Sequence, residues 1–205
     1  MLCDIDLAIE AGSSLAITGD SGSGKSTLLQ LLAGILVPLR GEVVFDEKPF
    51  SSLPRRQRDH IRLQHFGFVF QFGELLHELT LAENVELPLL FMGIKRSRAR
   101  ELARAALDGV GLEELGTRYP HQVSGGQQQR AAIARAVAHR PRVLLADEPT
   151  GSLDEETSRV VMDLLLETAG AQDTTVIVVT HSRNVADRCK RVLRVGGGAL
   201  AEVVS

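Results

Sequence analysis

The sequence GDSGSGKST, residues 19–27, decides the fold of this chain. It fits the pattern G-x-x-x-x-G-K-[ST], in which glycines let backbone N–H groups curl around phosphate oxygens without a Cβ in the way. Lys25 supplies a positive charge to the β- and γ-phosphates of a nucleotide, and Ser26 offers a hydroxyl to Mg²⁺. The residues assigned to this phosphate loop are Gly19, Asp20, Ser21, Gly22, Ser23, Gly24, Lys25, Ser26 and Thr27.

The segments on either side of the phosphate loop support a nucleotide site. Residues 15–18 (LAIT) are short, apolar and partly β-branched, which predicts a buried strand that stops at Gly19. A helical pattern of leucines starts at Lys25, so the positive end of that helix points at the phosphate. A glycine-rich turn that merely caps a helix is the alternative, and the strand–loop–helix order favours the nucleotide site over it. The loop alone does not separate a kinase, a GTPase, a DNA motor and a transporter ATPase.

Length and composition describe an ordinary globular chain. With 205 residues, and about 150 residues per domain as a guide, one domain is expected. Hydrophobic residues make up 44% and charged residues 24%, and the net charge of −3 argues against a broadly basic nucleic-acid binder. The aromatic content of 4% argues against a stacking platform for bases. We therefore expect no nucleic-acid partner.

The chain lacks the sequence features of a secreted or membrane-spanning protein. Cys3 and Cys189 are too few for a disulfide framework, which favours a reducing cytosol, and we expect both to be small buried residues. No apolar run approaches the roughly 18 residues of a membrane span. The N-terminus carries acids where a secretory leader needs bases. These features predict a cytosolic protein with no span of its own.

Strands and helices alternate along the rest of the chain. The patterns predict strands at 41–45, 66–70, 143–146 and 174–180, helices at 97–110 and 127–138, and a turn between terminal strands at 196–198. Apolar strands separated by helices are typical of a parallel sheet covered on both faces. We predict one domain, 1–205, in which residues 1–71 and 139–205 form an α/β core and residues 72–138 form an inserted helical subdomain.

Two acids, Asp147 and Glu148, follow the apolar strand at 143–146. Ligands of open parallel sheets sit at the carboxyl ends of the strands, so Asp147 is expected near Lys25 and Ser26, where it can hold Mg²⁺. Glu148 is one step further on and can polarise a water for attack on the γ-phosphate. The alternative is a polar strand end in an ordinary loop. The paired acids favour hydrolysis over transfer to a small substrate, because they offer a base for water.

A second glycine-rich helix start occurs at residues 123–127 (VSGGQ). Ser124 and two glycines before a helix form another anion-binding nest, although one nucleotide does not need two. If this nest faces the γ-phosphate of another copy's nucleotide, two chains sandwich two ATP molecules. The alternative is an ordinary helix cap with a flexible glycine pair.

These motifs together resemble the ATP-binding-cassette (ABC) ATPases over about residues 9–200. VSGGQ looks like the LSGGQ signature of that family, with Val123 in place of leucine. Gln71 looks like the Q-loop glutamine, Asp154 like the D-loop aspartate and His181 like the switch histidine. GDSGSGKSTLL, RYPHQVSGGQQQRAAIARAV and LLADEPTGSLD look more narrowly like the MacB/LolD/FtsE-type subgroup, whose members serve lipoprotein release, drug or peptide export, and cell-division permeases.

The resemblance implies a P-loop NTPase fold of the α/β class, with an ABC-type RecA-like core, an antiparallel β part and the helical insert. It implies an ATPase that uses ATP and Mg²⁺, dimerises around ATP and drives a separate membrane permease from the cytoplasmic face of the cell membrane. The alternative is a non-transport ABC ATPase, such as a cell-division signalling ATPase with a permease-like partner. The catalytic residues implied are Glu148, His181 and Gln71; the metal ligands are Ser26, Gln71 and Asp147; and Ser124, Gly125, Gly126, Gln127 and Asp154 act on the other copy's nucleotide.

The chain departs from the family pattern upstream of the phosphate loop. ABC subunits normally carry an aromatic residue there that stacks on adenine, and none of the residues before Gly19 is Phe, Tyr or Trp. The family's first strand is also missing from the sequence; truncation, a late start codon and a real shortening are all compatible with this. Because one stacking contact is worth about 1 kcal/mol, we expect weaker ATP binding than in a relative that has it.

Overall fold

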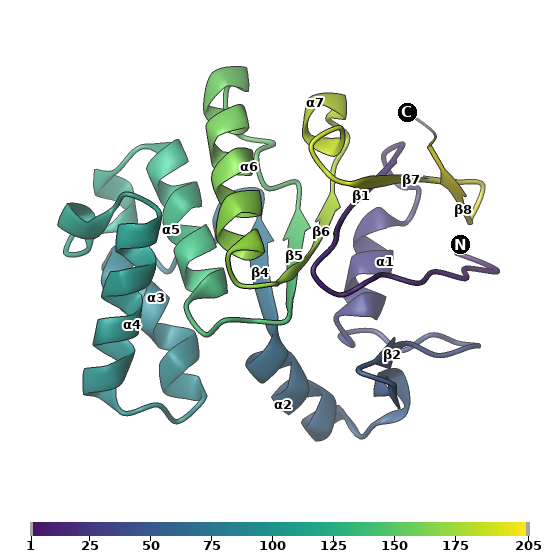
Figure 1. Ribbon diagram of the computed structural model, residues 1–205, viewed down its shortest axis with the longest axis horizontal. Coiled ribbons are helices and arrows are strands. Elements are labelled where there is room, and N and C mark those ends of the chain that lie inside the picture. Colours follow the sequence, from purple (N-terminus) through teal and green to yellow (C-terminus); the bar gives the residue numbers. More distant parts are fainter. Residues whose placement is uncertain (1, 204–205) are drawn as a thin grey trace.

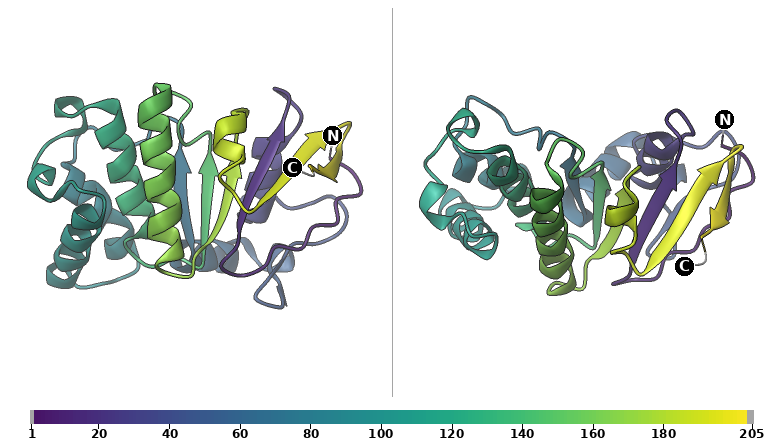
Figure 2. Two further views of the ribbon diagram at one scale, coloured as in Figure 1. Left: turned by 45° about the horizontal axis from the view of Figure 1, so that its top comes forward. Right: turned by 90° about the horizontal axis from the view of Figure 1, so that it is seen from above.

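The computed structural model describes residues 2–203. Its main sheet has six strands in the order β4-β5-β6-β1-β7-β8, and helices cover both faces (Figures 1 and 2). All neighbouring pairs from β4 to β7 are parallel, and only β8 runs antiparallel to its neighbour. The strands are β1 Ser14–Gly19, β4 Phe66–Phe70, β5 Val143–Asp147, β6 Thr175–Val179, β7 Arg191–Gly196 and β8 Ala199–Glu202, with a small hairpin of β2 Val44–Phe45 and β3 Lys48–Pro49.

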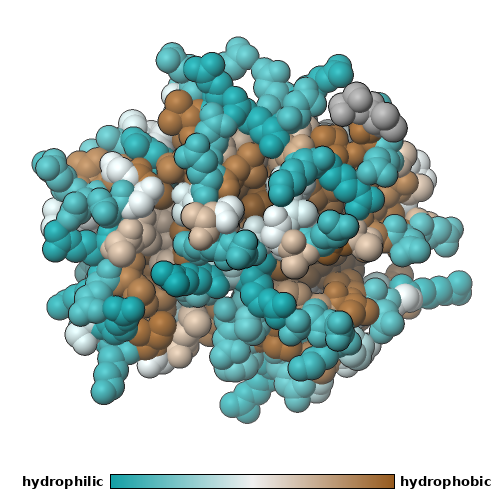
Figure 3. Space-filling view, viewed as in Figure 1, coloured by the Kyte–Doolittle hydropathy of each residue, from teal (hydrophilic) through white to brown (hydrophobic). Residues whose placement is uncertain are grey.

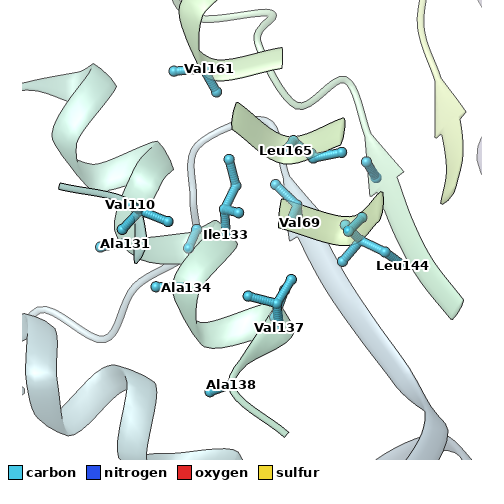
Figure 4. Close-up of a cluster of buried hydrophobic side chains, with 14 of the residues drawn as sticks. Val69, Val110, Ala131, Ile133, Ala134, Val137, Ala138, Leu144, Val161 and Leu165 are labelled. Carbon is cyan, nitrogen blue, oxygen red and sulfur yellow. The ribbon is translucent and has the colours of Figure 1, made fainter. Parts of the chain in front are cut away.

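Alternating strand residues divide the core into two layers. On one face, Ala16, Val69 and Leu144 pack with helices α3 to α6. Figure 4 shows Val69 and Leu144 beside side chains of α5 and α6. On the other face, Leu15 and Ile17 pack with α1 and with the aromatic residues of the first third of the chain. The helices are α1 Lys25–Leu32, α2 Arg55–His65, α3 Leu81–Phe91, α4 Arg96–Gly109, α5 Gly125–Val137, α6 Glu155–Gly170 and α7 Arg183–Ala186, with 3₁₀ turns at η1 Phe50–Ser52, η2 Glu113–Leu115 and η3 Pro120–Gln122.

The predicted strands form, with small differences at their ends. The strand at 66–70 has the predicted bounds, whereas the strand predicted at 41–45 is shorter, since only residues 44–45 pair with 48–49. The predicted helix at 127–138 starts two residues earlier, because Ser124 caps it and both glycines enter its first turn. Helix α6 was not predicted; its signals are the cap Asp154 and the buried residues Val161 and Leu165 on one face.

One prediction about the cysteines is wrong. Cys189 is buried as expected, whereas Cys3 is exposed. The reason is that the segment containing Cys3 runs along the outer edge of the sheet, where its backbone N–H donates to Gly198 O in the β7–β8 turn (2.8 Å). The segment that begins at residue 2 lies beside β8 in Figure 1.

The surface is mainly hydrophilic on the face shown in Figure 3, and its hydrophobic patches are small and separate. Among the described residues, no helix combines the length and the apolar character that a membrane crossing needs.

Candidate functional site

Parallel pairing brings four sequence motifs to one edge of the sheet. β4, β5, β6 and β1 are consecutive neighbours, so their carboxyl ends lie in a row. Gln71 follows β4, and Asp147 and Glu148 stand at the end of β5. His181 follows β6 after one residue, and the phosphate loop begins at Gly19, the last residue of β1. The edge where ligands of such sheets bind therefore carries these predicted residues together.

Glycine is required at several positions of the phosphate loop. Gly19 has φ +145°, and a Cβ there would lie 2.5 Å from the carbonyl oxygen of Val195. Gly22 (φ +76°) and Gly24 (φ +105°) also adopt conformations that side chains disfavour. Gly24 is the N-terminal cap of α1, and no side chain caps that helix. The first N–H groups of α1 are therefore left for a ligand.

The polar groups of the loop fit a phosphate chain. Lys25 Nζ folds back over the loop and donates to the carbonyl oxygens of Gly19 and Asp20, both at 2.9 Å. The hydroxyl of Ser23 is buried and has no hydrogen-bond partner in the part of the chain that is described. A buried orphan hydroxyl is costly unless it is satisfied, and a phosphate oxygen would satisfy it.

Asp147 and Ser26 have the donor chemistry that Mg²⁺ prefers. Burial raises the pKa of Asp147, Glu148 raises it further, and the Ser26 hydroxyl and Lys25 ammonium oppose that shift. Within residues 2–203, no three His, Cys, Asp or Glu side chains converge as a metal cage. Mg²⁺ usually takes only one or two protein oxygens beside phosphate oxygens and waters, so a hydroxyl and a carboxylate fit it.

Glu148 is held by the end of β6. Its Oε1 lies 2.8 Å from His181 Nδ1, and its Oε2 accepts hydrogen bonds from Thr180 Oγ1 (3.1 Å) and the His181 backbone (3.3 Å). Glu148 has φ +48°, a strained conformation for a non-glycine residue. Its side chain is 19% exposed and that of His181 is 70% exposed, so the pair faces solvent through the histidine.

Gln71 packs against the loop that follows Glu148. Its backbone carbonyl accepts a hydrogen bond from Ser152 Oγ (2.9 Å), and a Cβ on Gly151 would lie 2.9 Å from Gln71 Nε2. Beside this loop, a cavity of about 950 Å³ opens between Glu148, His181 and the first turn of α6. The sheet edge therefore continues into an open polar hollow.

The second glycine motif lies elsewhere. Helix α5 packs beside β4, the edge strand, whereas the phosphate loop follows β1, three strands further along (Figures 1 and 2). Ser124 and Gln127 form a reciprocal capping box at its start: Gln127 N donates to Ser124 Oγ (3.3 Å) and Ser124 N to Gln127 Oε1 (2.9 Å). A Cβ on Gly126 would lie 2.7 Å from Thr157 Cγ2, so this glycine permits close packing on α6.

Asp154 has a local role in the fold. It caps α6, accepting hydrogen bonds from Thr157 N (2.9 Å) and Thr157 Oγ1 (2.6 Å). These bonds lower the pKa of Asp154, because they stabilise its charged form. Ser124, Gly125, Gly126 and Gln127, at the start of α5, are thus not brought to the phosphate loop of the same chain, whereas Asp154 serves here as the cap of α6.

Sequence reasoning missed three residues that support the site. Thr180 and Ser152 hold Glu148 and Gln71, and Arg135 bonds the turn after Gln71. Thr180 had a signal, since it ends an apolar strand directly before His181. Arg135 had none, because an arginine in a helical pattern usually points into solvent.

Comparison with known proteins agrees with this geometry. Residues 2–151 match the family model described as ABC transporter. The chain is 46% identical over 200 residues to a lipoprotein-releasing system ATP-binding protein, LolD, of Legionella pneumophila, which covers 98% of this chain and 88% of that protein. It is 44% identical over 199 residues to LolD of Xanthomonas axonopodis pv. citri, covering 97% and 82%.

Solved structures share the fold. A dimeric bacterial ABC transporter cassette superposes with a TM-score of 0.87 at 39% identity, covering 100% of this chain and 91% of that one. The same values hold for a post-hydrolysis dimer bound to ADP and phosphate. The structure of cbiO1 from Clostridium perfringens, part of the ABC transporter complex cbiONQ, has a TM-score of 0.89 at 32% identity, and the match covers 98% of this chain and 80% of that one.

Proposed function

The chain belongs to the ABC transporter family, and on that premise we propose that it is the ATPase subunit of a transporter of the lipoprotein-releasing type. It binds ATP, hydrolyses it to ADP and phosphate, and drives a separate permease. The identity of 46% with LolD, over nearly the whole of both chains, supports the lipoprotein-releasing type.

ATP binding rests on the phosphate loop. The backbone N–H groups at the start of α1 and the Lys25 ammonium surround the β- and γ-phosphates, and the orphan Ser23 hydroxyl gains an acceptor. Ser26, Asp147 and Gln71 are the residues that would hold Mg²⁺, which would neutralise phosphate charge when bound. Lys25 uses two of its three N–H donors on the carbonyls of Gly19 and Asp20, so one donor is left for a phosphate oxygen.

Glu148 is the residue we assign as general base. It accepts a proton from the attacking water, whose oxygen bonds to the γ-phosphorus while the bond to the β-phosphate oxygen breaks. His181 Nδ1 lies within hydrogen-bond distance of Glu148 Oε1, so the histidine orients this carboxylate. The Glu148–His181–Thr180 arrangement is the observation that carries hydrolysis, since it fixes a carboxylate at the strand end next to Asp147.

The complete site needs a second copy of the chain. The nest at 124–127 is three strands from the phosphate loop, so within one chain it has no nucleotide to contact. In a dimer, the partner's nest would face the γ-phosphate and the partner's Asp154 would lie near the interface. The dimeric cassettes that share this fold support such a pair.

Exposed apolar side chains after Gln71 support docking of a permease. Phe72 is 70% exposed and Leu76 is 45% exposed, while Leu75 between them is buried. Partly exposed apolar side chains beside a site residue are suited to contact a partner helix.

We place the subunit on the cytoplasmic face of the cell membrane, where it is bound through that permease. We divide the chain into an α/β core (1–71, 139–205) and a helical subdomain (72–138).

Replacement of the general base tests the proposal. Glu148→Gln should lower the turnover number by at least about a hundredfold, because the amide cannot take the proton from water, while ATP still binds. The variant should form a dimer in saturating ATP and Mg²⁺, measured by light scattering behind a sizing column. Glu42→Gln, an exposed change in the loop before β2, is the matched control and should behave like the wild type. A Glu148→Gln chain that stays monomeric under these conditions would contradict the ATP-bridged dimer.

A further inference from the structure

The turn that follows β4 is bonded to helix α5 through its backbone. Gln129 Nε2 donates to the carbonyl oxygen of Phe70 at 2.8 Å. The guanidinium of Arg135 donates to two successive carbonyls of the turn, Gly73 O through Nη2 and Glu74 O through Nη1, both at 2.7 Å. Two side chains of a single helix thus hold the backbone on both sides of Gln71.

The turn adopts a conformation that needs such support. Gly73 has φ +69° and Glu74 has φ +44°, so two successive residues are left-handed. For Glu74 this conformation costs of order 1 kcal/mol or more and persists only where the surroundings impose it. The carbonyl of Gln71 is held from the other side by Ser152. The position of Gln71 is therefore fixed by bonds to its neighbours.

Arg135 is suited to hold two carbonyls. Its planar guanidinium presents several N–H donors in a fixed fork, which an ammonium cannot reproduce. Burial lowers the pKa of Arg135 from its usual value, and Glu74 opposes that shift. Arginine stays charged in proteins even so, and its guanidinium therefore remains a donor.

Helix α5 also carries the nest that would face the partner's nucleotide. Its first turn contains Ser124–Gln127, and its far end packs closely on β4, where a Cβ on Gly67 would lie 2.3 Å from Ala136 O. Helices are stiff along their length, so the Gln71 turn and the nest are attached to the same rigid element. Arg135 is the strongest link between them, since it makes two short charge-assisted bonds.

We propose that Arg135 is a positioning residue for hydrolysis, which sets the place of Gln71 relative to the nucleotide by tying the Gly73–Glu74 backbone to the signature helix. This inference rests on the proposed function, because the proposed function is what gives Gln71 a part in turnover. Arg135 touches neither nucleotide nor metal, and its effect on the reaction passes through Gln71. Loss of the two guanidinium hydrogen bonds should leave ATP binding at the phosphate loop intact and should lower turnover.

A double-mutant cycle in the whole chain tests the proposal. Arg135→Met keeps most of the side-chain volume but removes the donors, and should lower kcat about tenfold or more with KM for ATP changed by less than about twofold. In a Gln71→Ala background, Arg135→Met should lower kcat by less than about twofold further, since the residue through which Arg135 acts is already gone. Arg135→Lys, which can hold one carbonyl, should recover part of kcat.

Arg58→Met provides the matched control. Arg58 is also partly buried and donates to two carbonyls, Gly34 O (3.1 Å) and Leu53 O (2.6 Å), but it lies on α2, away from Gln71. This variant should lose similar thermal stability and keep kcat. If Arg135→Met fails to fold, Arg135→Lys carries the cycle.

Two results would overturn the role of Arg135. One is a kcat for the Arg135 variants equal to that of Arg58→Met. The other is that Arg135→Met lowers kcat by the same factor in the Gln71→Ala background as in the wild type. Failure of the proposed function gives a different result: the wild-type chain would show no ATPase activity, or Glu148→Gln would turn over at the wild-type rate.

Discussion

The two serine- and glycine-rich helix starts of this protein differ in what they leave unsatisfied. At the phosphate loop, Gly24 caps α1 without a side-chain bond and the Ser23 hydroxyl is a buried orphan. At the start of α5, Ser124 and Gln127 satisfy each other in a capping box. The start of α1 leaves donors free for an anion that binds to the same chain. The start of α5 is already satisfied by its own side chains. This difference is what we expect if the first motif binds a nucleotide by itself and the second, as we propose, completes a site only when a second chain presents a phosphate.

Removal of the Lys25 side chain should show the largest effect, because the start of α1 depends on a positively charged side chain and the start of α5 does not. Lys25→Ala should weaken ATP binding by roughly a hundredfold, since charge-assisted hydrogen bonds are worth about 1.5–3 kcal/mol. Titration with a fluorescent ATP analogue measures this. Lys48→Ala, an exposed change on β3, is the control and should bind normally. Unchanged affinity in Lys25→Ala would remove the phosphate loop from the binding site.

Glycine replacements should separate backbone geometry from ligand contact. Gly19→Ala should destabilise the fold by about 2–4 kcal/mol, because the new Cβ meets Val195 O at 2.5 Å in a left-handed conformation. Gly22→Ala, where the Cβ meets open space at φ +76°, should cost only about 1 kcal/mol. Urea unfolding followed by circular dichroism gives both values. Equal losses would mean that the contact with β7 is relieved at little cost.

Removal of the serine cap should have the smallest effect and should sharpen the contrast. Ser124→Ala should lower the free energy of unfolding by about 1 kcal/mol, the usual value of a helix cap. ATP binding by the single chain should stay within about twofold, because the nest is remote from its own phosphate loop, while turnover falls about fivefold. Thermal melting, nucleotide titration and steady-state ATPase assays measure the three quantities. A loss of ATP affinity in the single chain would mean that the nest contacts the nucleotide of its own chain, which would contradict the proposed site.

Much of the site could be predicted from local patterns. Residues 19–27 and the acids after β5 are short motifs whose chemistry depends on neighbours in sequence, and the structure brings Gly19, Asp147 and Glu148 to one sheet edge as expected. Cys3 was predicted incorrectly, since burial depends on which surface covers a segment. Helix α6 was overlooked because its cap, Asp154, was interpreted for its part in a dimer.

Local sequence patterns are enough to identify the phosphate loop, the acid pair and the strands of the main sheet from residue 15 to residue 180, because each depends on residues a few positions apart. The contacts of Arg135 and Gln129 with the turn after Gln71, about 60 residues away in the chain, become visible only in the folded chain. The tertiary structure also decided that Gly126 serves close packing on Thr157. The physical reason is that such contacts arise from how α5 lies against β4 and α6, and a helical pattern does not encode the neighbour toward which a side chain reaches.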